Sequence, residues 1–376
     1  MTFTPFELLE WQGRLGATAT HSLADSGCRP IRLRDLVDSE QSLNRLLDSE
    51  LSYPPTCGTT RLRALIAQWH AGSADHASEV IVTAGAAEAN TVAVETLIRP
   101  GDHVVTMSPG YRQVWGAARN QGAVVEEFPL EPQRGWRPDI PALADMVRPD
   151  TRAISVTNPN NPAGIILTDE EMDAIVSIAD RVGAWILSDE VHRGTELRTE
   201  AVSPTFRGRY DRVVCVGSLS KAFGMPGLRL GWLITPPVLA PRLRQRHEYT
   251  TVSAAGPAMA LAELALAPAT RTRLLDRYRG FLRESWTHMH QWVASHDQLL
   301  SVVPPQATSL AFVRYHLDEL TSTEVAEALH ARGGVLVAPG AHFGTEHHLR
   351  FTYGQEPAHL LAALEKTSHI LKELSA

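Results

Sequence analysis

A lysine in a loop of small and hydroxyl residues is the first candidate for chemistry in this sequence. Lys221 lies in the segment SLSKAFGMPGLRLGW, directly after the apolar run VVCVG. An amine at the end of a buried strand is partly desolvated, which favours the neutral form that attacks carbonyl groups. Arg229 follows eight positions later, and Ser218 and Ser220 lie just upstream. A guanidinium and hydroxyl donors can bind a phosphate, although a surface lysine beside a turn fits this segment about equally well.

Three further loops carry polar groups where an element begins or ends. In VTAGAAEAN, a turn at Gly85 precedes a helix whose first free N–H groups, at Ala86 and Ala87, favour an anion. TNPNNPAG holds Asn161 between two prolines, which rigidify the loop and fix the amide. SDEV places Asp189 at the end of the apolar run AWIL, where a carboxylate is costly unless a cation lies opposite. Taken singly, each loop also fits an ordinary turn.

The elements that must position these loops alternate between short apolar runs and helical periods. Amphipathic helices are predicted over 60–71 and 169–183, and short buried strands in the segments 79–85, 102–111, 152–164, 183–191 and 211–221. Strands that alternate with helices indicate a mainly parallel sheet covered on both faces. In such sheets a ligand site forms at the carboxyl ends of the strands, which is where the four loops lie.

After about residue 250 the pattern changes. A long helix over 271–296 is followed by short strands at 310–316, 334–340 and 348–354 and by a final helix. This order is typical of a smaller α+β lobe. We therefore expect an N-terminal arm that packs with the small lobe, a large domain and a small C-terminal domain, with the respective ranges 1–45, 46–250 and 251–376.

Composition excludes several other classes of protein. The chain has 376 residues and a net charge of −7, which gives no reason to expect nucleic acid or an anionic membrane as a partner. Cys28, Cys57 and Cys215 lack metal-ligand spacing, so we expect no metal and a reducing compartment. The N-terminus lacks the pattern of a signal peptide, and no apolar run reaches about 18 residues. A cytoplasmic protein is therefore expected.

Together the segments resemble the fold-type I pyridoxal 5′-phosphate (PLP) enzymes, specifically the class I/II aminotransferase family. The resemblance runs from about residue 45 to the end and rests on GAAEA, PGY, NPNNPAG, SDEV, SLSKAFGMPGLRLGW and HLRF, in the family's order. It implies an α/β fold in which a large domain, with a mainly parallel seven-stranded sheet covered by helices, carries a smaller α+β domain. A DNA-binding regulator of related fold is disfavoured, because no basic helix-turn-helix precedes residue 45.

The resemblance also implies a role for each matching residue. Lys221 would form the internal aldimine and then move protons, while Asp189 would pair with the protonated pyridine nitrogen of PLP. Asn161 would hydrogen-bond the ring oxygen O3′ and contact the substrate, and Tyr111 would stack on the ring. Arg350, in HLRFTYG, would bind the α-carboxylate of an amino acid in a bidentate fork.

The remaining implied contacts concern the phosphate and a second subunit. The groups that would hold the phosphate are Ser218, Ser220, Arg229 and the backbone of Gly85, Ala86 and Ala87. Tyr53, in LSYPPTCG, matches a tyrosine that reaches the phosphate of the neighbouring subunit, so a homodimer is implied. Candidates for the pocket that selects the substrate side chain are Trp11, Asp25, Glu88 and the segment 248–253.

One position departs from the common pattern of the family. Three residues after Asp189, where many members have a tyrosine that bonds O3′, this sequence has His192. The local sequence SDEVH resembles lyases that cleave carbon–sulfur bonds, and an isosteric replacement with little effect is an equal alternative. The segments GSLSKAFGMPGLRLGW, EYTTVS and GVLVAPGAHFG resemble the capreomycidine-synthase-like subgroup, which cyclises an arginine-type substrate.

Two reactions therefore stay open. Aminotransfer at the Cα of an L-amino acid is the default. The alternative is β- or γ-elimination, replacement or cyclisation of an amino acid in bacterial specialised metabolism. Both would use Lys221 and Arg350 in the same way, so the motifs do not separate them.

Overall fold

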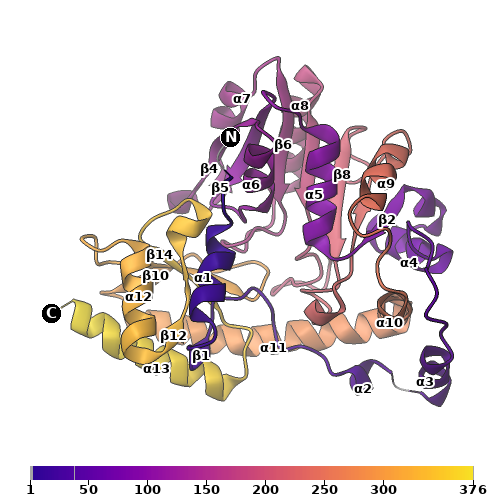
Figure 1. Ribbon diagram of the computed structural model, residues 1–376. Helices are drawn as coiled ribbons and strands as arrows, with labels where there is room; N and C mark the ends of the chain where they lie inside the picture. Colours follow the sequence, from indigo (N-terminus) through magenta and orange to yellow (C-terminus); the bar gives the residue numbers. More distant parts are fainter. Residues whose placement is uncertain (1–2, 38, 376) are drawn as a thin grey trace.

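A large mixed sheet forms the centre of the protein, whose structure is a computed structural model that describes residues 3–37 and 39–375 (Figure 1). Its strand order is β2-β9-β8-β7-β6-β3-β4-β5. The bounds are β2 (Val80–Thr83), β9 (Gly231–Ile234), β8 (Val213–Ser218), β7 (Trp185–Asp189), β6 (Thr151–Thr157), β3 (His103–Ser108), β4 (Val124–Glu131) and β5 (Arg137–Pro138). The strands from β8 to β4 are parallel, whereas β9 and β5 run antiparallel to their neighbours. The predicted mainly parallel sheet is confirmed, with the two-residue β5 as an additional edge strand.

Helices cover both faces of this sheet because the strand side chains alternate between two apolar cores. In β8, Val214 and Val216 pack in one core, and Val213 and Cys215 pack in the other. The first core lies under α5 (Ala86–Leu97), α6 (Gln113–Asn120) and α9 (Ala240–Glu248). The second receives α4 (Thr60–Ala71), α7 (Ile140–Met146), α8 (Asp169–Val182) and α10 (Gly256–Leu266).

Local sequence explains where two of these helices begin and end. Thr168 and Glu171 form a capping box at the start of α8, and Gly183 ends the helix in the left-handed conformation. The hydroxyl of Thr59 accepts a hydrogen bond from the backbone N–H of Leu62 at the start of α4. The helix α4 matches its predicted range, and α8 ends one residue before the end of its predicted range, at Val182.

A second, four-stranded antiparallel sheet has the order β10-β11-β14-β13 and lies to one side of the large sheet (Figure 1). Its strands are β10 (Leu300–Val302), β11 (Leu310–Tyr315), β14 (His348–Thr352) and β13 (Ala338–Pro339). The helices α12 (Ser322–Gly333) and α13 (Pro357–Leu374) belong to this side, and α11 (Pro268–Ala294) runs beneath both sheets (Figure 1).

The N-terminal arm adds to the smaller sheet's side of the molecule. Its strand β1 (His21–Ser22) pairs with β12 (Val335–Leu336), so the strand predicted over 334–340 is in fact β12 and β13. The strand is interrupted because Val337 lies between two different partners, the N-terminal arm and β14. The predicted division at residues 45 and 250 stays a prediction; α10, which follows residue 250, contacts α4.

The remaining elements are short. They are α1 (Glu7–Leu15), α2 (Leu33–Leu36), α3 (Glu40–Leu47) and four 3₁₀ turns at Ala74–Glu79, Pro132–Arg134, Pro226–Leu228 and Gly340–Phe343. Among the described helices, none is both long enough and apolar enough to cross a membrane.

Candidate active site

The carboxyl ends of several strands meet at one edge of the large sheet. Asp189, the last residue of β7, pairs in register with Thr157 at the end of β6 and with Val216 of β8. Gly231, the first residue of β9, pairs with both Thr83 and Ser218, the last residues of β2 and β8. The loops that follow these strands therefore start side by side, which is the placement that the sequence predicts.

Lys221 lies in the loop after β8 and is partly buried. Its Nζ donates a hydrogen bond to Ser26 Oγ at 2.7 Å. Burial lowers the pKa of Lys221 to about 8, and the positive charge of Arg350 acts in the same direction, while Asp25 and Asp189 oppose it. Roughly a tenth of this amine is therefore neutral, and nucleophilic, at pH 7, far more than for an ordinary lysine.

Asp189 is a buried carboxylate, only 8% exposed. Its Oδ2 accepts a hydrogen bond from Asn90 Nδ2 at 3.0 Å, and its Oδ1 accepts one from the N–H of Val191 at 3.2 Å. Burial raises the pKa of Asp189 despite these hydrogen bonds. A cation placed opposite would favour the ionised carboxylate, so the site suits a protonated ring nitrogen.

Arg350, on β14, is a residue of the smaller sheet that lies in the site. The side chain is 1% exposed, and its Nη1 donates to Asn161 Oδ1 at 3.0 Å. Its Nη2 donates to the carbonyls of Ala24 and Asp25. Burial lowers the pKa of Arg350 to about 10, so it stays charged at neutral pH. The guanidinium lies 4.7 Å from the ring centre of Phe343.

Asn161 differs from the other asparagines of NPNNPAG. Asn158 accepts from the N–H of Leu167 at 2.9 Å, and Asn160 accepts from the N–H of Ala163 at 2.8 Å. These two asparagines fix the loop itself. Asn161 instead faces Arg350 through Oδ1, which leaves its Nδ2 hydrogens as the donors for a ligand.

Tyr111 follows β3 and packs against the N-terminal segment. Its ring centre lies 5.1 Å from that of Phe6. Burial raises the pKa of Tyr111, and the charges of Arg350, Asp189 and Arg229 also act on its hydroxyl. The phenol therefore lies among the candidate residues and stays neutral.

The proposed phosphate cradle is built around Gly85, which has φ +88°. A Cβ at this position would lie 2.6 Å from Arg229 Nη2, so only glycine lets the guanidinium reach the first turn of α5. Ser218 and Ser220 are buried, and the Ser218 hydroxyl accepts from the N–H of Ser220 at 3.2 Å. These groups thus surround the start of a 12-residue helix, where backbone N–H groups favour an anion.

The same edge requires a second glycine. A Cβ at Gly231 would lie 2.5 Å from the backbone nitrogen of Ala86. The beginning of α5, with Ala86 and Ala87, therefore packs directly on the beginning of β9, next to the cradle.

His192 is 1% exposed, and neither ring nitrogen has a hydrogen-bond partner among the described residues. Burial lowers the pKa of His192 well below its ordinary value, and the charges of Lys221 and Arg350 add to this effect. The imidazole is therefore neutral at physiological pH. Buried polar groups without a protein partner usually meet a ligand or water, so His192 points to a bound group beside Lys221.

The other expected residues have different surroundings. Tyr53 is 90% exposed, so within one chain it does not join this cluster. Trp11 is buried and donates from Nε1 to the carbonyl of Val337 at 2.9 Å. Glu88 accepts from the N–H of Ala84 at 2.6 Å and lies 2.9 Å from His247 Nδ1, which ties it to α9. Of the candidate pocket residues, Asp25 contacts Arg350 through its backbone carbonyl.

Sequence reasoning missed two contacts of the site. Asn90 lies within the quoted segment VTAGAAEAN, yet its contact with Asp189 spans 99 positions. Ser26 is 195 positions from Lys221. A polar side chain in the first turns of a buried helix is a usable signal for Asn90, whereas nothing local marks Ser26.

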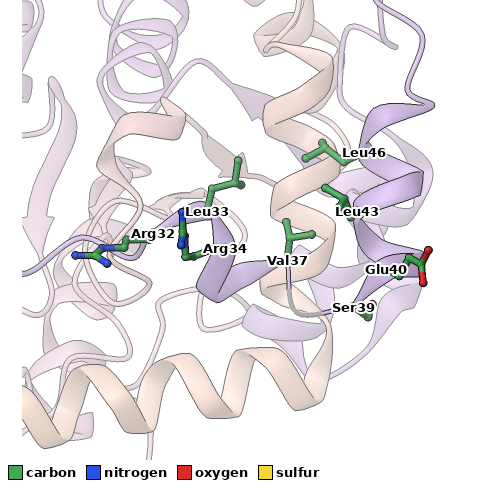
Figure 2. A pocket seen from close by; sticks show the side chains of 8 residues that line it. All are labelled: Arg32, Leu33, Arg34, Val37, Ser39, Glu40, Leu43 and Leu46. Atoms are coloured by element: carbon green, nitrogen blue, oxygen red, sulfur yellow. The ribbon is translucent and has the colours of Figure 1, made fainter.

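A cavity with other lining residues lies elsewhere. It has a volume of about 870 Å³ and is formed by α2 and α3, with Leu33, Val37, Leu43 and Leu46 among its lining residues (Figure 2). None of the candidate site residues lines it. It therefore belongs to the N-terminal arm and not to the chemistry around Lys221.

The residues around Lys221 provide the polar groups that PLP requires. The unpartnered nitrogens of His192, the buried carboxylate of Asp189 and the glycine cradle at Gly85 match a ring oxygen, a ring nitrogen and a phosphate. Lys221 supplies the amine that such an aldehyde requires.

Comparison with known proteins agrees with this geometry. Residues 32–366 match the family described as "Aminotransferase class I and II". The chain is 32% identical to capreomycidine synthase of Streptomyces vinaceus, over 80% of this chain and 75% of that protein. A PLP-dependent aminotransferase from Streptococcus suis has a TM-score of 0.92 at 30% identity, covering 100% of this chain and 99% of that one.

A third similar protein is described as a cyclase. The PLP-dependent cyclase OrfR has a TM-score of 0.87 at 27% identity, with 99% of this chain and 98% of that chain covered. The family therefore includes enzymes named for aminotransfer and for cyclisation, all of the same fold. By its family match, its relatives and its fold, this chain belongs to the class I and II aminotransferase family of PLP-dependent enzymes.

Proposed function

We propose that this protein acts at the Cα of an L-amino acid and that aminotransfer is its default reaction. One observation carries the proposal: a partly buried amine, Lys221, lies in the same cluster as the buried carboxylate of Asp189 and the guanidinium of Arg350. When bound, PLP supplies an aldehyde for the amino group of the substrate and a ring that withdraws electrons. The protein supplies the positions and the proton transfers.

Each residue then has a task that follows from its surroundings. Arg350 binds the α-carboxylate with the hydrogens that remain, because Nη1 carries one beyond that donated to Asn161 and Nε has no partner among the described residues. Asp189 and Tyr111 orient the ring, and the groups at Gly85 and Arg229 hold the phosphate. Lys221 Nζ takes the proton from Cα, since an amine with a pKa of about 8 can both accept and return a proton near neutral pH.

We further propose a homodimer with sites completed across the interface. Tyr53 is 90% exposed, and the neighbouring Leu51 and Leu47 are 87% and 71% exposed. Exposed apolar side chains grouped along one segment are typical of a surface that another chain covers. In the dimer, Tyr53 would reach the phosphate of the second subunit.

Elimination, replacement or cyclisation is the second candidate. It is supported by His192 at the place of the usual tyrosine and by the similarity to capreomycidine synthase and to the cyclase OrfR. A neutral imidazole has its donor and its acceptor on two separate ring nitrogens, whereas a phenol has both on one oxygen.

Incubation of the purified protein with a panel of amino acids separates the two candidates. Aminotransfer converts the bound cofactor to its amine form and releases a keto acid, and a second keto acid restores the aldehyde. Elimination instead releases ammonia or a side-chain leaving group without that conversion. The Lys221→Ala variant should be inactive in both assays; turnover by this variant would contradict the proposal.

A further inference from the structure

A carboxylate at the wall of the site has no cation of its own. The hydroxyl of Ser26 accepts from Lys221 Nζ at 2.7 Å, and the carbonyl of Asp25 accepts from Arg350 Nη2 at 3.3 Å. Asp25 therefore lies between the amine and the guanidinium on which the proposed function depends. Within residues 3–37 and 39–375, its carboxylate has no ion-pair partner within 4.0 Å.

The backbone fixes the direction of this side chain. Asp25 Oδ1 accepts from the N–H of Gly27 at 2.7 Å, and the carbonyl of Asp25 accepts from Thr352 as well as from Arg350. Asp25 is nevertheless exposed, and Oδ2 has no hydrogen-bond partner among the described residues, so it is available to accept from a ligand. A carboxylate held in one orientation needs little further ordering when a ligand binds.

The electrostatic effect of Asp25 reaches both neighbours. Its charge opposes the lowering of the pKa of Lys221 and of Arg350 that burial causes. A substrate adds its own α-carboxylate beside Arg350, and its amino group is joined to the cofactor. The negative charges of Asp25 and of the substrate carboxylate would then both act on the Arg350 guanidinium, while Asp189 would be engaged by the ring nitrogen. A positive charge on the substrate side chain would offset this excess.

We propose that Asp25 selects amino acids whose side chain is cationic, an ammonium or a guanidinium, by hydrogen bonding that group through Oδ2. The inference rests on the proposed function, because it takes Arg350 as the anchor of the α-carboxylate. Asp25 touches the substrate but moves no proton. Acidic amino acids are excluded by the same charge, since their side chain would add a third carboxylate.

Binding of two ligands of matched shape tests this. α-Methylornithine and α-methylnorleucine differ in a terminal ammonium against a methyl group, and neither has a Cα hydrogen to lose. Dissociation constants are measured from the change in cofactor absorbance for the wild type and for Asp25→Asn, in which the amide oxygen can still accept from Gly27. Asp318→Asn, an exposed carboxylate near Arg314 on the small sheet's side, is the control.

The wild type and the control should prefer the ammonium ligand by roughly tenfold or more. Asp25→Asn should lose that preference while binding the methyl ligand within about twofold of the wild type. Equal weakening of both ligands in Asp25→Asn would overturn the assignment and would mean that Asp25 acts through Lys221 or Arg350. A wild type that binds both ligands equally well would also overturn it. A protein that takes up no PLP would instead refute the proposed function, so the two failures are distinct.

Discussion

At the scale of single residues, the site contains buried polar groups that lack hydrogen-bond or ion-pair partners among the described residues. His192 has two unpartnered ring nitrogens among the described residues, and Arg350 Nε is likewise buried without a partner. Asp189 is buried with hydrogen bonds but no cation within 4.0 Å in the described chain. Protein interiors normally pair such groups. Ligands that supply the missing hydrogen-bond partners and the missing cation therefore explain why these groups lie together around Lys221.

Removing the charge of Asp189 tests the role of that carboxylate. Asp189→Asn keeps the shape but cannot stabilise a protonated ring nitrogen, so exchange of the substrate Cα hydrogen with D₂O should slow by roughly a hundredfold or more. The exchange is followed by NMR, with Asp318→Asn as the matched control. Exchange close to the wild-type rate would show that the ring nitrogen does not need this partner.

The lowered pKa of Lys221 predicts the pH dependence of cofactor uptake. The neutral amine attacks the aldehyde, and with a pKa of about 8 it is mostly protonated below pH 8 and mostly neutral above it. The rate at which protein stripped of cofactor takes up PLP should therefore rise through pH 8 and level off. An ordinary lysine would shift this rise to about pH 10.4, so a rate that still climbs above pH 10 would contradict the burial of this amine.

At the scale of elements, α5 carries much of the site and is anchored at its first turn. Its backbone N–H groups face the cradle, Asn90 holds Asp189, and Glu88 contacts His247 of α9. Hydrogen bonds from His247 and Thr250 lower the pKa of Glu88 to about 2 although burial opposes this. The Glu88 carboxylate in turn raises the pKa of His247 against the effect of burial.

Glu88→Gln should therefore destabilise the protein by about 2–3 kcal/mol, because both side chains are nearly inaccessible to solvent. The contribution of Glu88 is present above about pH 4.5 and is lost as the pH falls through its folded pKa of about 2. The contribution of His247 is full below about pH 6.5 and is lost as the pH rises through its raised folded pKa. The difference from the wild type should thus be largest between about pH 4.5 and 6.5.

Denaturant unfolding at several pH values measures this difference. Glu95→Gln is the control, because Glu95 lies on the same helix and faces Arg246 of α9 at 3.8 Å in a much more exposed pair. That variant should lose less than about 1 kcal/mol. Similar losses in the free energy of unfolding for both variants would mean that the buried Glu88–His247 contact stabilises the protein no more than an exposed ion pair does.

At the scale of the whole molecule, the site exists only where three parts of the chain meet. The large sheet supplies Lys221 and Asp189, the smaller sheet supplies Arg350, and the N-terminal arm supplies Ser26 and Asp25. A second contact between the sheets is aromatic: Trp136 beside β5 packs on Phe312 of β11, with ring centres 5.5 Å apart.

The proposed dimer adds a fourth part. Tyr53→Phe removes a phenol hydroxyl that would bind the phosphate of the second subunit, so PLP affinity should fall by roughly tenfold, as measured by equilibrium dialysis. Asp318→Asn, an exposed carboxylate near Arg314 on the small sheet's side, is the control and should leave the affinity unchanged. A monomer in sedimentation at micromolar concentration, or unchanged affinity in Tyr53→Phe, would contradict the shared site.

The sequence predicts those features of the fold and the site that depend on residues close together in the chain. The ends of strands and the helices 60–71 and 169–182 follow from local patterns and caps, so Asp189 and the loop of Lys221 are placed correctly. The contact of Ser26 with Lys221 joins residues far apart and leaves no local signal, whereas for Asn90 the sequence marks a polar residue near the start of a helix but not its partner Asp189. The break between β12 and β13 was missed for the same reason, because the pairing of β12 with β1 decides it.

The central claim is that Lys221 is the residue to which the cofactor is joined. Borohydride reduction of the protein saturated with PLP, followed by proteolysis and mass spectrometry, tests it directly. We predict a single reduced pyridoxyl adduct on the peptide that contains Lys221, and loss of that adduct in Lys221→Ala. An adduct on Lys366 or Lys372, or no adduct at saturating PLP, would contradict the account.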